Sequence, residues 1–210
     1  MRSLGRVVAP WALVVLCAGA ARATVGGADV IEVLGWDATA QKVYVAQHYR
    51  GESGYPPAIA SFDLKGAGAG AAVVEPWSVS DTLGAAEYAR RDRALRTRLA
   101  PLPPAPAVSI FDFTRVLARD TVEVGGGRWP RLRVLASRLR ADWDGAFEVT
   151  AYRDPSVRVL SLHPIPGHAE RLAIVSFLGI PWEGGYETQV PVVIPARADT
   201  LRLAWKPFRR

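Results

Sequence analysis

The sequence predicts a mainly β protein: an antiparallel β-sandwich or open barrel built from two related β-meanders, with one α-helix near residues 84–100. Nineteen Gly and 16 Pro among 210 residues supply many turns, and short runs rich in β-branched and aromatic residues lie between them. Only one long segment has the apolar period of a helix. Half of the residues are apolar and 22% are charged, which excludes an intrinsically disordered chain.

The first 23 residues have the three-part pattern of a secretory signal peptide. Arg2 and Arg6 form a basic start, Val7–Ala20 is apolar, and Ala21-Arg22-Ala23 offers small residues to a signal peptidase. The apolar run is shorter than the roughly 20 residues that span a bilayer. We therefore expect cleavage after Ala23, a secreted or periplasmic location, and no integral membrane segment in the mature chain. A retained anchor, or lipid attachment at Cys17, stays open as an alternative.

The predicted cleavage also changes the charge and the cysteine content. It removes three arginines and the only cysteine, which leaves 23 basic and 20 acidic side chains, a net charge of +3. The whole-chain charge of +6 is therefore no argument for a nucleic-acid partner, and we expect none. Without cysteine, the mature chain has no disulfides, thiol nucleophile or Cys-ligated zinc.

The mature chain is predicted to be one secreted β domain, residues 24–210. Residues 24–100 form the first meander and the helix, residues 101–107 a Pro-rich connector, and residues 108–210 a second β half. Eleven short strands are expected: Val30–Trp36, Lys42–Tyr49, Ala58–Leu64, Val108–Phe113, Thr121–Val124, Arg131–Ser137, Ala146–Tyr152, Val157–Leu162, Arg171–Leu178, Thr188–Ile194 and Leu201–Trp205.

Residues 84–100 are expected to form the single long helix. Tyr88 and Leu95 fall on one stripe of it, and acid–arginine pairs at i,i+4 spacing support it. Ser80 or Asp81 is the predicted N-cap.

A faint internal repeat relates two parts of the chain. In the first, Val33-Leu34 precedes a long strand, a Glu52–Tyr55 hairpin tip and a return strand. In the second, Val159-Leu160 precedes a long strand, a Glu183–Tyr186 tip and a return strand. Each unit is typical of a β-meander, and of a propeller blade. Two units cannot close a propeller, so we expect a pair of related meanders; coincidence stays open.

The first unit resembles a known protein family. Val33-Leu34-Gly35-Trp36-Asp37, the strand Val43–Ala46 and the tip Glu52–Pro56 are similar to a family of bacterial predicted secreted proteins of unknown function. Its members have a signal peptide and a propeller-like first strand pair followed by an Ala/Arg-rich helix, which Tyr88–Leu102 would match. The resemblance covers roughly residues 30–102 and implies export. It implies no activity, cofactor or catalytic residue.

Motifs for known chemistry are few. The sequence has no nucleophile elbow, no His-Glu-x-x-His and no phosphate-binding glycine loop, so we assign no catalytic residue and no cofactor. His163 and His168 bracket a Pro-stiffened loop, with Glu170 close by. They are weak candidates for a metal site, because their spacing matches no standard ligand set. Ordinary hydrogen-bonded histidines are the alternative.

Two hairpin tips are the predicted interaction surface. Each tip places aromatic side chains and a carboxylate beside glycine at the end of a strand pair, where binding residues often lie. The predicted residues are Glu52, Tyr55, Trp182, Glu183 and Tyr186. Ordinary turn chemistry would also account for them.

The sequence therefore predicts an exported cell-envelope protein without catalytic activity. It would bind another envelope protein or a cell-wall component. The alternative is a secreted hydrolase that uses a pair of turn acids or a His163/His168 metal site. Convergence of His48, His163, His168 and the turn acids in one pocket would favour the hydrolase. The turn acids are Asp37, Glu52, Asp142, Asp144 and Glu183.

Overall fold

The computed structural model describes residues 30–48, 56–65, 72–77, 83–105, 113–140, 143–181, 185–194 and 201–202. The predicted signal peptide lies outside these residues. The strands are β1 (Val30–Asp37), β2 (Lys42–His48), β3 (Ala58–Asp63), β4 (Ala72–Trp77), β5 (Phe113–Val124), β6 (Gly127–Arg140), β7 (Trp143–Tyr152), β8 (Val157–Pro164), β9 (Arg171–Ile180), β10 (Tyr186–Ile194) and β11 (Leu201–Arg202). The helix α1 spans Ala85–Arg96. The predicted mainly β fold is confirmed.

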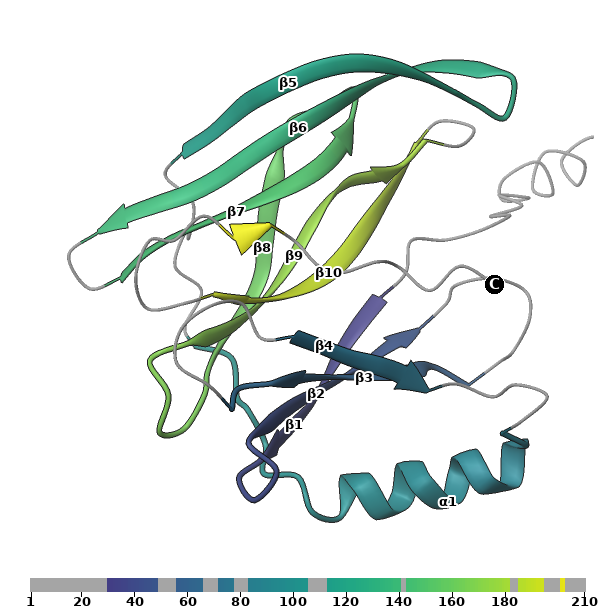
Figure 1. Cartoon of the computed structure of the whole chain (residues 1–210), viewed down its shortest axis with the longest axis vertical. Coiled ribbons are helices and arrows are strands. Elements are labelled where there is room, and N and C mark those ends of the chain that lie inside the picture. Colours follow the sequence, from purple (N-terminus) through teal and green to yellow (C-terminus); the bar gives the residue numbers. More distant parts are fainter. Residues whose placement is uncertain are drawn as a thin grey trace, which may run out of the picture.

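Strands that follow one another along the chain lie side by side in three separate sheets (Figure 1). The first sheet has the order β1-β2-β3-β4, the second β5-β6-β7 with β11 beside β7, and the third β8-β9-β10. All pairings are antiparallel except the two-residue pairing of β11 with β7. Both predicted meanders are present, and β5-β6-β7 is a further meander between them in the sequence.

The sheets stack as a sandwich, with α1 on one outer face (Figure 1). One apolar cluster joins the β5–β7 sheet to the β8–β10 sheet, and a second joins the β8–β10 sheet to the β1–β4 sheet. A third cluster lies between the β1–β4 sheet and α1. The β8–β10 sheet is therefore the middle layer. Burial of apolar surface on both of its faces is the main stabilising term of the fold.

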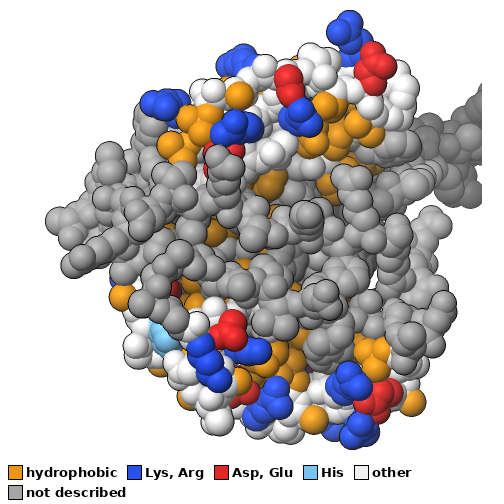
Figure 2. Space-filling view, in the orientation of Figure 1, with side chains coloured by type: hydrophobic (Ala, Val, Ile, Leu, Met, Phe, Trp, Pro, Cys, Tyr) orange, Lys and Arg blue, Asp and Glu red, His pale blue; other side chains and the backbone are white. Residues whose placement is uncertain are grey.

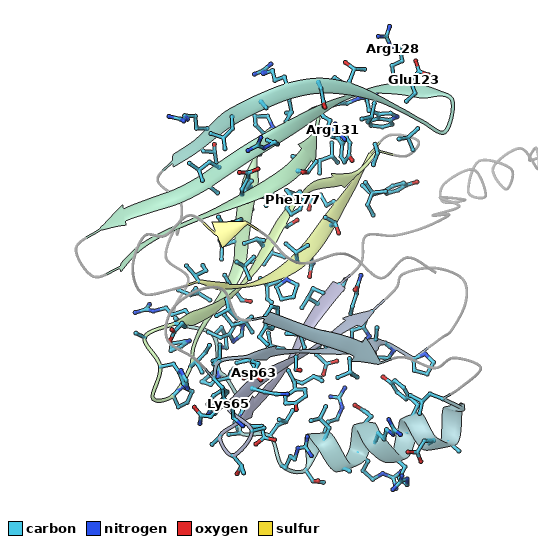
Figure 3. The ribbon with its side chains drawn as sticks, viewed as in Figure 1. Asp63, Lys65, Glu123, Arg128, Arg131 and Phe177 are labelled. Atoms are coloured by element: carbon cyan, nitrogen blue, oxygen red, sulfur yellow. The ribbon has the colours of Figure 1, made fainter. Side chains whose placement is uncertain are left out.

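Strand β9 shows why the middle sheet is buried on both faces. Ala173, Val175 and Phe177 belong to the cluster shared with the β5–β7 sheet, and Figure 3 labels Phe177 between the two layers. Leu172 and Ile174 belong to the cluster shared with the β1–β4 sheet. Side chains alternate between the two faces of a strand, so a continuous apolar run of this kind fills two interfaces at once.

Each meander carries a β-bulge at a Val-Leu sequence in its first strand. The bulges skip the leucine of Val33-Leu34-Gly35, Val116-Leu117-Ala118 and Val159-Leu160-Ser161. In each case the valine pairs with a valine of the next strand, Val45, Val134 or Val175. A bulge bends and twists an edge strand, which disfavours pairing with a further strand. The two units identified in the sequence thus share their strand order and the place of their bulge with a third unit.

Several predicted boundaries are corrected by the structure. The helix ends at Arg96 rather than Ala100, and its N-cap is Gly84, with no side-chain cap; Ser80 and Asp81 lie outside the described residues. β4 was not predicted. Thr121–Val124 is the end of one long strand that begins at Phe113, because β5 continues through charged residues that pair with β6. Most of the predicted strand Val108–Phe113 lies outside the described residues.

Residues 97–105, here called the strap, connect the edges of two sheets. Trp36 of β1 and Ala100 exchange two backbone hydrogen bonds, and the Ala105 N–H donates to the carbonyl of Leu162 in β8. Between these points Leu102 is buried in the cluster shared by the two sheets. Part of the predicted Pro-rich connector therefore holds the β1–β4 and β8–β10 sheets together.

No helix in the described part of the chain has the length and apolar character needed to cross a membrane.

Candidate functional site

Only Tyr186 of the five predicted interaction residues lies among the described residues. Glu52, Tyr55, Trp182 and Glu183 lie outside them. Tyr186 begins β10, pairs with Ile180 of β9, and is half-buried. Its position next to the β9–β10 connection is the one that the hairpin pattern predicts.

The end of the β9–β10 hairpin rests on Trp129 of β6. Gly185 has φ +87°, and a Cβ built there would lie 3.3 Å from the Trp129 ring. Trp129 is 4% exposed, and the Arg153 guanidinium stacks over its ring at 4.1 Å from the centroid. Packing against a buried indole, with a cation over its face, fixes the hairpin base in position. Neither Trp129 nor Arg153 was singled out from the sequence, because no pattern linked β6 to a tip so distant along the chain.

His163 is part of the junction between the strap and β8. It is buried, its Nδ1 lies 2.6 Å from the Leu102 carbonyl oxygen, and its Nε2 lies 2.9 Å from the Ser161 Oγ. Both ring nitrogens therefore have a hydrogen-bond partner within the protein. A buried polar side chain with both groups satisfied stabilises one arrangement of the chain.

His168 lies in the β8–β9 connection and contacts the β1–β2 turn. Its Nε2 lies 2.8 Å from the Gln41 Oε1, its ring meets the Trp36 ring edge-on at 5.0 Å, and its Nδ1 lies 3.6 Å from a Glu170 oxygen. Across the described residues, no group of three or more His, Cys, Asp or Glu side chains could hold a metal ion. His163, His168 and Glu170, the weak metal candidates, accordingly do not form such a group.

His48 belongs to an ion-pair chain that ties α1 to the edge of the β1–β4 sheet. The Glu32 carboxylate accepts from His48 at 2.7 Å and from Arg96 at 2.8 Å, and Arg96 also pairs with Asp92 at 2.9 Å. The hydrogen bond from Arg96 lowers the pKa of Glu32, with a smaller lowering from His48. These contacts connect helix to sheet, and we assign them that role.

Two of the five turn acids, Asp37 and Asp144, lie among the described residues. Asp37 is buried, accepts the backbone N–H groups of Thr39 and Ala40, and pairs with Arg98 at 3.0 Å. It therefore shapes the β1–β2 turn. Glu52, Asp142 and Glu183 lie outside the described residues, and Asp144 lies within β7.

Two surface hollows are formed by described residues, and no histidine lines either of them. The first, of about 560 Å³, lies along α1 beside Pro56. Tyr88 lines it and donates a 2.6 Å hydrogen bond to the Pro57 carbonyl, and burial raises the pKa of Tyr88 to about 12. The second, of about 370 Å³, lies over the β5–β7 sheet and is lined by Ala118, Arg119, Asp120, Arg131, Arg133, Thr150 and Tyr152.

Comparison with known proteins found no matching family model, no matching curated protein and no matching solved structure.

Proposed function

We propose that this chain is an exported, non-enzymatic binding module of the bacterial cell envelope. Its β-hairpin ends would contact another envelope protein or a cell-wall component. The observation that carries the proposal is the β9–β10 hairpin base, where Gly185 packs on buried Trp129 and Tyr186 stays half-buried beside the tip. Export is inferred from the signal-peptide pattern of residues 1–23 and from the resemblance over residues 30–102.

A hairpin held in this way suits binding more than catalysis. A fixed loop loses little conformational entropy when it binds, and tyrosine adds contact area with few rotatable bonds. The alternative hydrolase would use a pair of turn acids or a His163/His168 metal site. His163 binds Leu102 and Ser161, whereas His168 binds Gln41. We therefore favour binding over hydrolysis.

Affinity capture with matched variants tests this function. The mature protein and its variants Tyr55→Ala and Tyr186→Ala are compared in two assays. The first captures partners from envelope extract, and the second measures cosedimentation of the protein with insoluble cell wall. His168→Ala, in the connection at the other end of β9, is the control. We expect capture that both tyrosine variants lose and the control keeps, with melting temperatures changed by a few degrees at most.

Two results would overturn the proposal. In one, capture is the same with and without the tyrosines. In the other, both tyrosine variants are destabilised by about 3 kcal/mol or more, as for the loss of core aromatic side chains. The second result would mean that the tyrosines cover the ends of the sheets.

A further inference from the structure

The arginine that covers Trp129 has an unusual backbone conformation. Arg153 directly follows β7 and has φ +62°, in the left-handed region that glycine and asparagine adopt at lower cost. Two backbone hydrogen bonds hold this turn: the Arg153 N–H donates to the Pro130 carbonyl at 2.9 Å, and the Asp154 N–H donates to the Tyr152 carbonyl at 2.7 Å. The turn therefore gives no reason for an arginine here, and strained residues of this kind are often found at functional sites.

The Trp129 ring determines where the guanidinium of Arg153 lies. The central carbon of the guanidinium is 4.1 Å from the ring centroid, and the ring itself is buried. A cation over an aromatic face is held by its charge. Arginine has five N–H donors, and within the described part of the structure none of those of Arg153 has a hydrogen-bond acceptor. The side chain is exposed, so a positioned group of donors remains available to a ligand.

No carboxylate among the described residues balances the charge of Arg153. The neighbouring arginines of β6 differ in this respect, because Arg128 pairs with Glu123 at 3.9 Å and Arg131 pairs with Asp120. Figure 3 labels Arg128 beside Glu123 at the tip of the β5–β6 hairpin. Figure 2 shows acidic side chains interspersed among the Lys and Arg side chains at the end of the molecule that the β5–β7 sheet forms. Arg153 is therefore an unpaired cation beside paired ones.

The same indole contacts both Arg153 and the base of the β9–β10 hairpin. A Cβ built at Gly185 would lie 3.3 Å from the Trp129 ring, and Tyr186 is the next residue. The carboxylate of Asp154 is engaged elsewhere, since it accepts the Ser156 N–H at 2.8 Å. The hairpin end thus combines a tyrosine with a positioned arginine, two of the residue types that contribute most to protein–protein binding.

We propose that Arg153 binds a side-chain carboxylate of an acidic peptide segment in the partner protein. The inference rests on the proposed binding function and adds the chemistry of the partner. A guanidinium matches a carboxylate through two parallel hydrogen bonds. A cell-wall sugar is less favoured, because sugar rings pack on open aromatic faces and Arg153 covers the face of Trp129. A membrane surface is less favoured, because one arginine adds little to the attraction of an anionic bilayer.

Selection from a phage-displayed library of random peptides tests this chemistry. The immobilised proteins are the mature chain, its variant Arg153→Gln, and the variant Arg128→Gln. The last is the matched control, because Arg128 is an exposed arginine of the same sheet that faces Glu123. We expect peptides rich in Asp and Glu from the mature chain and from the control. We expect no such enrichment from Arg153→Gln.

Titration calorimetry of one enriched peptide then separates direct binding from support of the hairpin. The peptide, and the same peptide with its acidic residue replaced by the amide, are each titrated into the mature chain and into Arg153→Gln. Either change alone should weaken binding about tenfold or more, the usual effect of losing a charge-assisted hydrogen bond. Both changes together should weaken it little further, because the two groups act on each other.

Two further variants complete the titrations. Arg128→Gln should weaken binding by less than about twofold. Arg153→Asn repeats the cycle with a residue that adopts the left-handed conformation more readily, so a loss of folding in Arg153→Gln does not leave the result open. Arg153→Asn should lose as much affinity for the acidic peptide as Arg153→Gln, with a melting temperature within a few degrees of that of the mature chain.

Three results would overturn the inference. The first is enrichment of acidic peptides that persists on Arg153→Gln. The second is an equal loss of affinity for the acidic peptide and its amide form, which would mean that Arg153 only positions the hairpin. The third is the absence of acidic peptides from the selection on the mature chain. In each case, capture from envelope extract that depends on Tyr186 would still support the proposed function, so the two proposals fail separately.

Discussion

Trp36 and Ala100 exchange two backbone hydrogen bonds, each 2.8 Å long, and this bridge closes the outer edge of β1. The bridge forms next to the bulge at Gly35, where φ is +139° and a Cβ would lie only 2.4 Å from the Ala100 carbonyl oxygen. Glycine is therefore needed both for its backbone conformation and for the close approach of the strap.

We expect Gly35→Ala to lower the free energy of unfolding by about 3 kcal/mol or more, from backbone strain together with displacement of the strap. Gly167→Ala separates the two causes, because Gly167 also has a positive φ, +78°, but a Cβ added there would have nothing within 4 Å. Gly167→Ala should lower the free energy of unfolding by only about 1 kcal/mol. Urea unfolding measures both, and equal losses would show that the close approach contributes nothing.

The strap should also contribute through Leu102. This side chain is 6% exposed and belongs to the cluster between two sheets. Leu102→Ala should therefore lower the free energy of unfolding by about 2–4 kcal/mol, because apolar surface is no longer buried and a cavity is left. Leu160→Ala is the matched control, because Leu160, the bulge leucine of β8, is 50% exposed; it should change stability by about 0.5 kcal/mol or less. Similar costs for the two variants would mean that the strap does not hold the sheets together.

The ion pair between Glu32 and Arg96 should make stability depend on pH in the acid range. The pKa of Glu32 is lowered in the folded chain from its ordinary 4.5, so the unfolded chain takes up this proton at a higher pH. The contribution is fully present above pH 4.5 and is lost as the pH falls through the lowered folded-state pKa.

Glu32→Gln should therefore be less stable than the wild type at pH 7, and the difference should shrink as the pH falls below 4.5. The difference at pH 7 should be under about 1 kcal/mol, because the Glu32 side chain is 39% exposed. Glu123→Gln, at a carboxylate 81% exposed and 3.9 Å from Arg128, should show little change at either pH. Chemical unfolding across this range measures the effect, and a constant difference would contradict it.

A better N-cap should stabilise the N-terminus of α1. Gly84 is the N-cap and provides no side-chain cap, and Glu87 stands three residues later. Gly84→Ser would create a Ser-x-x-Glu capping box and should raise the free energy of unfolding by about 0.5 kcal/mol. Gly84→Ala should lower it instead, because alanine is a poorer N-cap than glycine. If both substitutions shift the melting temperature in the same direction, capping does not limit the helix.

Local patterns in the sequence predicted the β1–β3 and β8–β10 meanders correctly. In β2, Val43 and Val45 face the middle sheet while Tyr44 and Ala46 face α1, which is the alternation that the sequence shows. The strand order of each unit followed from its short connections. The Val-Leu pairs that identified the repeat mark bulges in the structure.

The candidate surfaces were much less predictable. Tyr186 was found from its hairpin pattern, but Trp129 and Arg153 beneath that hairpin come from another sheet. In the sequence, Arg131 and Arg133 are ordinary charged residues. Only the register of β5, β6 and β7 sets Arg131 beside Asp120 and Tyr152, and Arg133 beside Ala118 and Thr150. Similarly, His163 and His168 are near in sequence but bind different partners, Leu102 and Gln41.

The sequence by itself therefore determined most of the strands, the strand order within each predicted meander and one helix, because these depend on residues close along the chain. The tertiary structure decided which sheet lies in the middle, that the strap joins β1 to β8, and which side chains share a surface. Those relationships depend on pairings between residues far apart in the sequence, where no local period or turn preference acts, and on burial that only the complete stack of sheets provides.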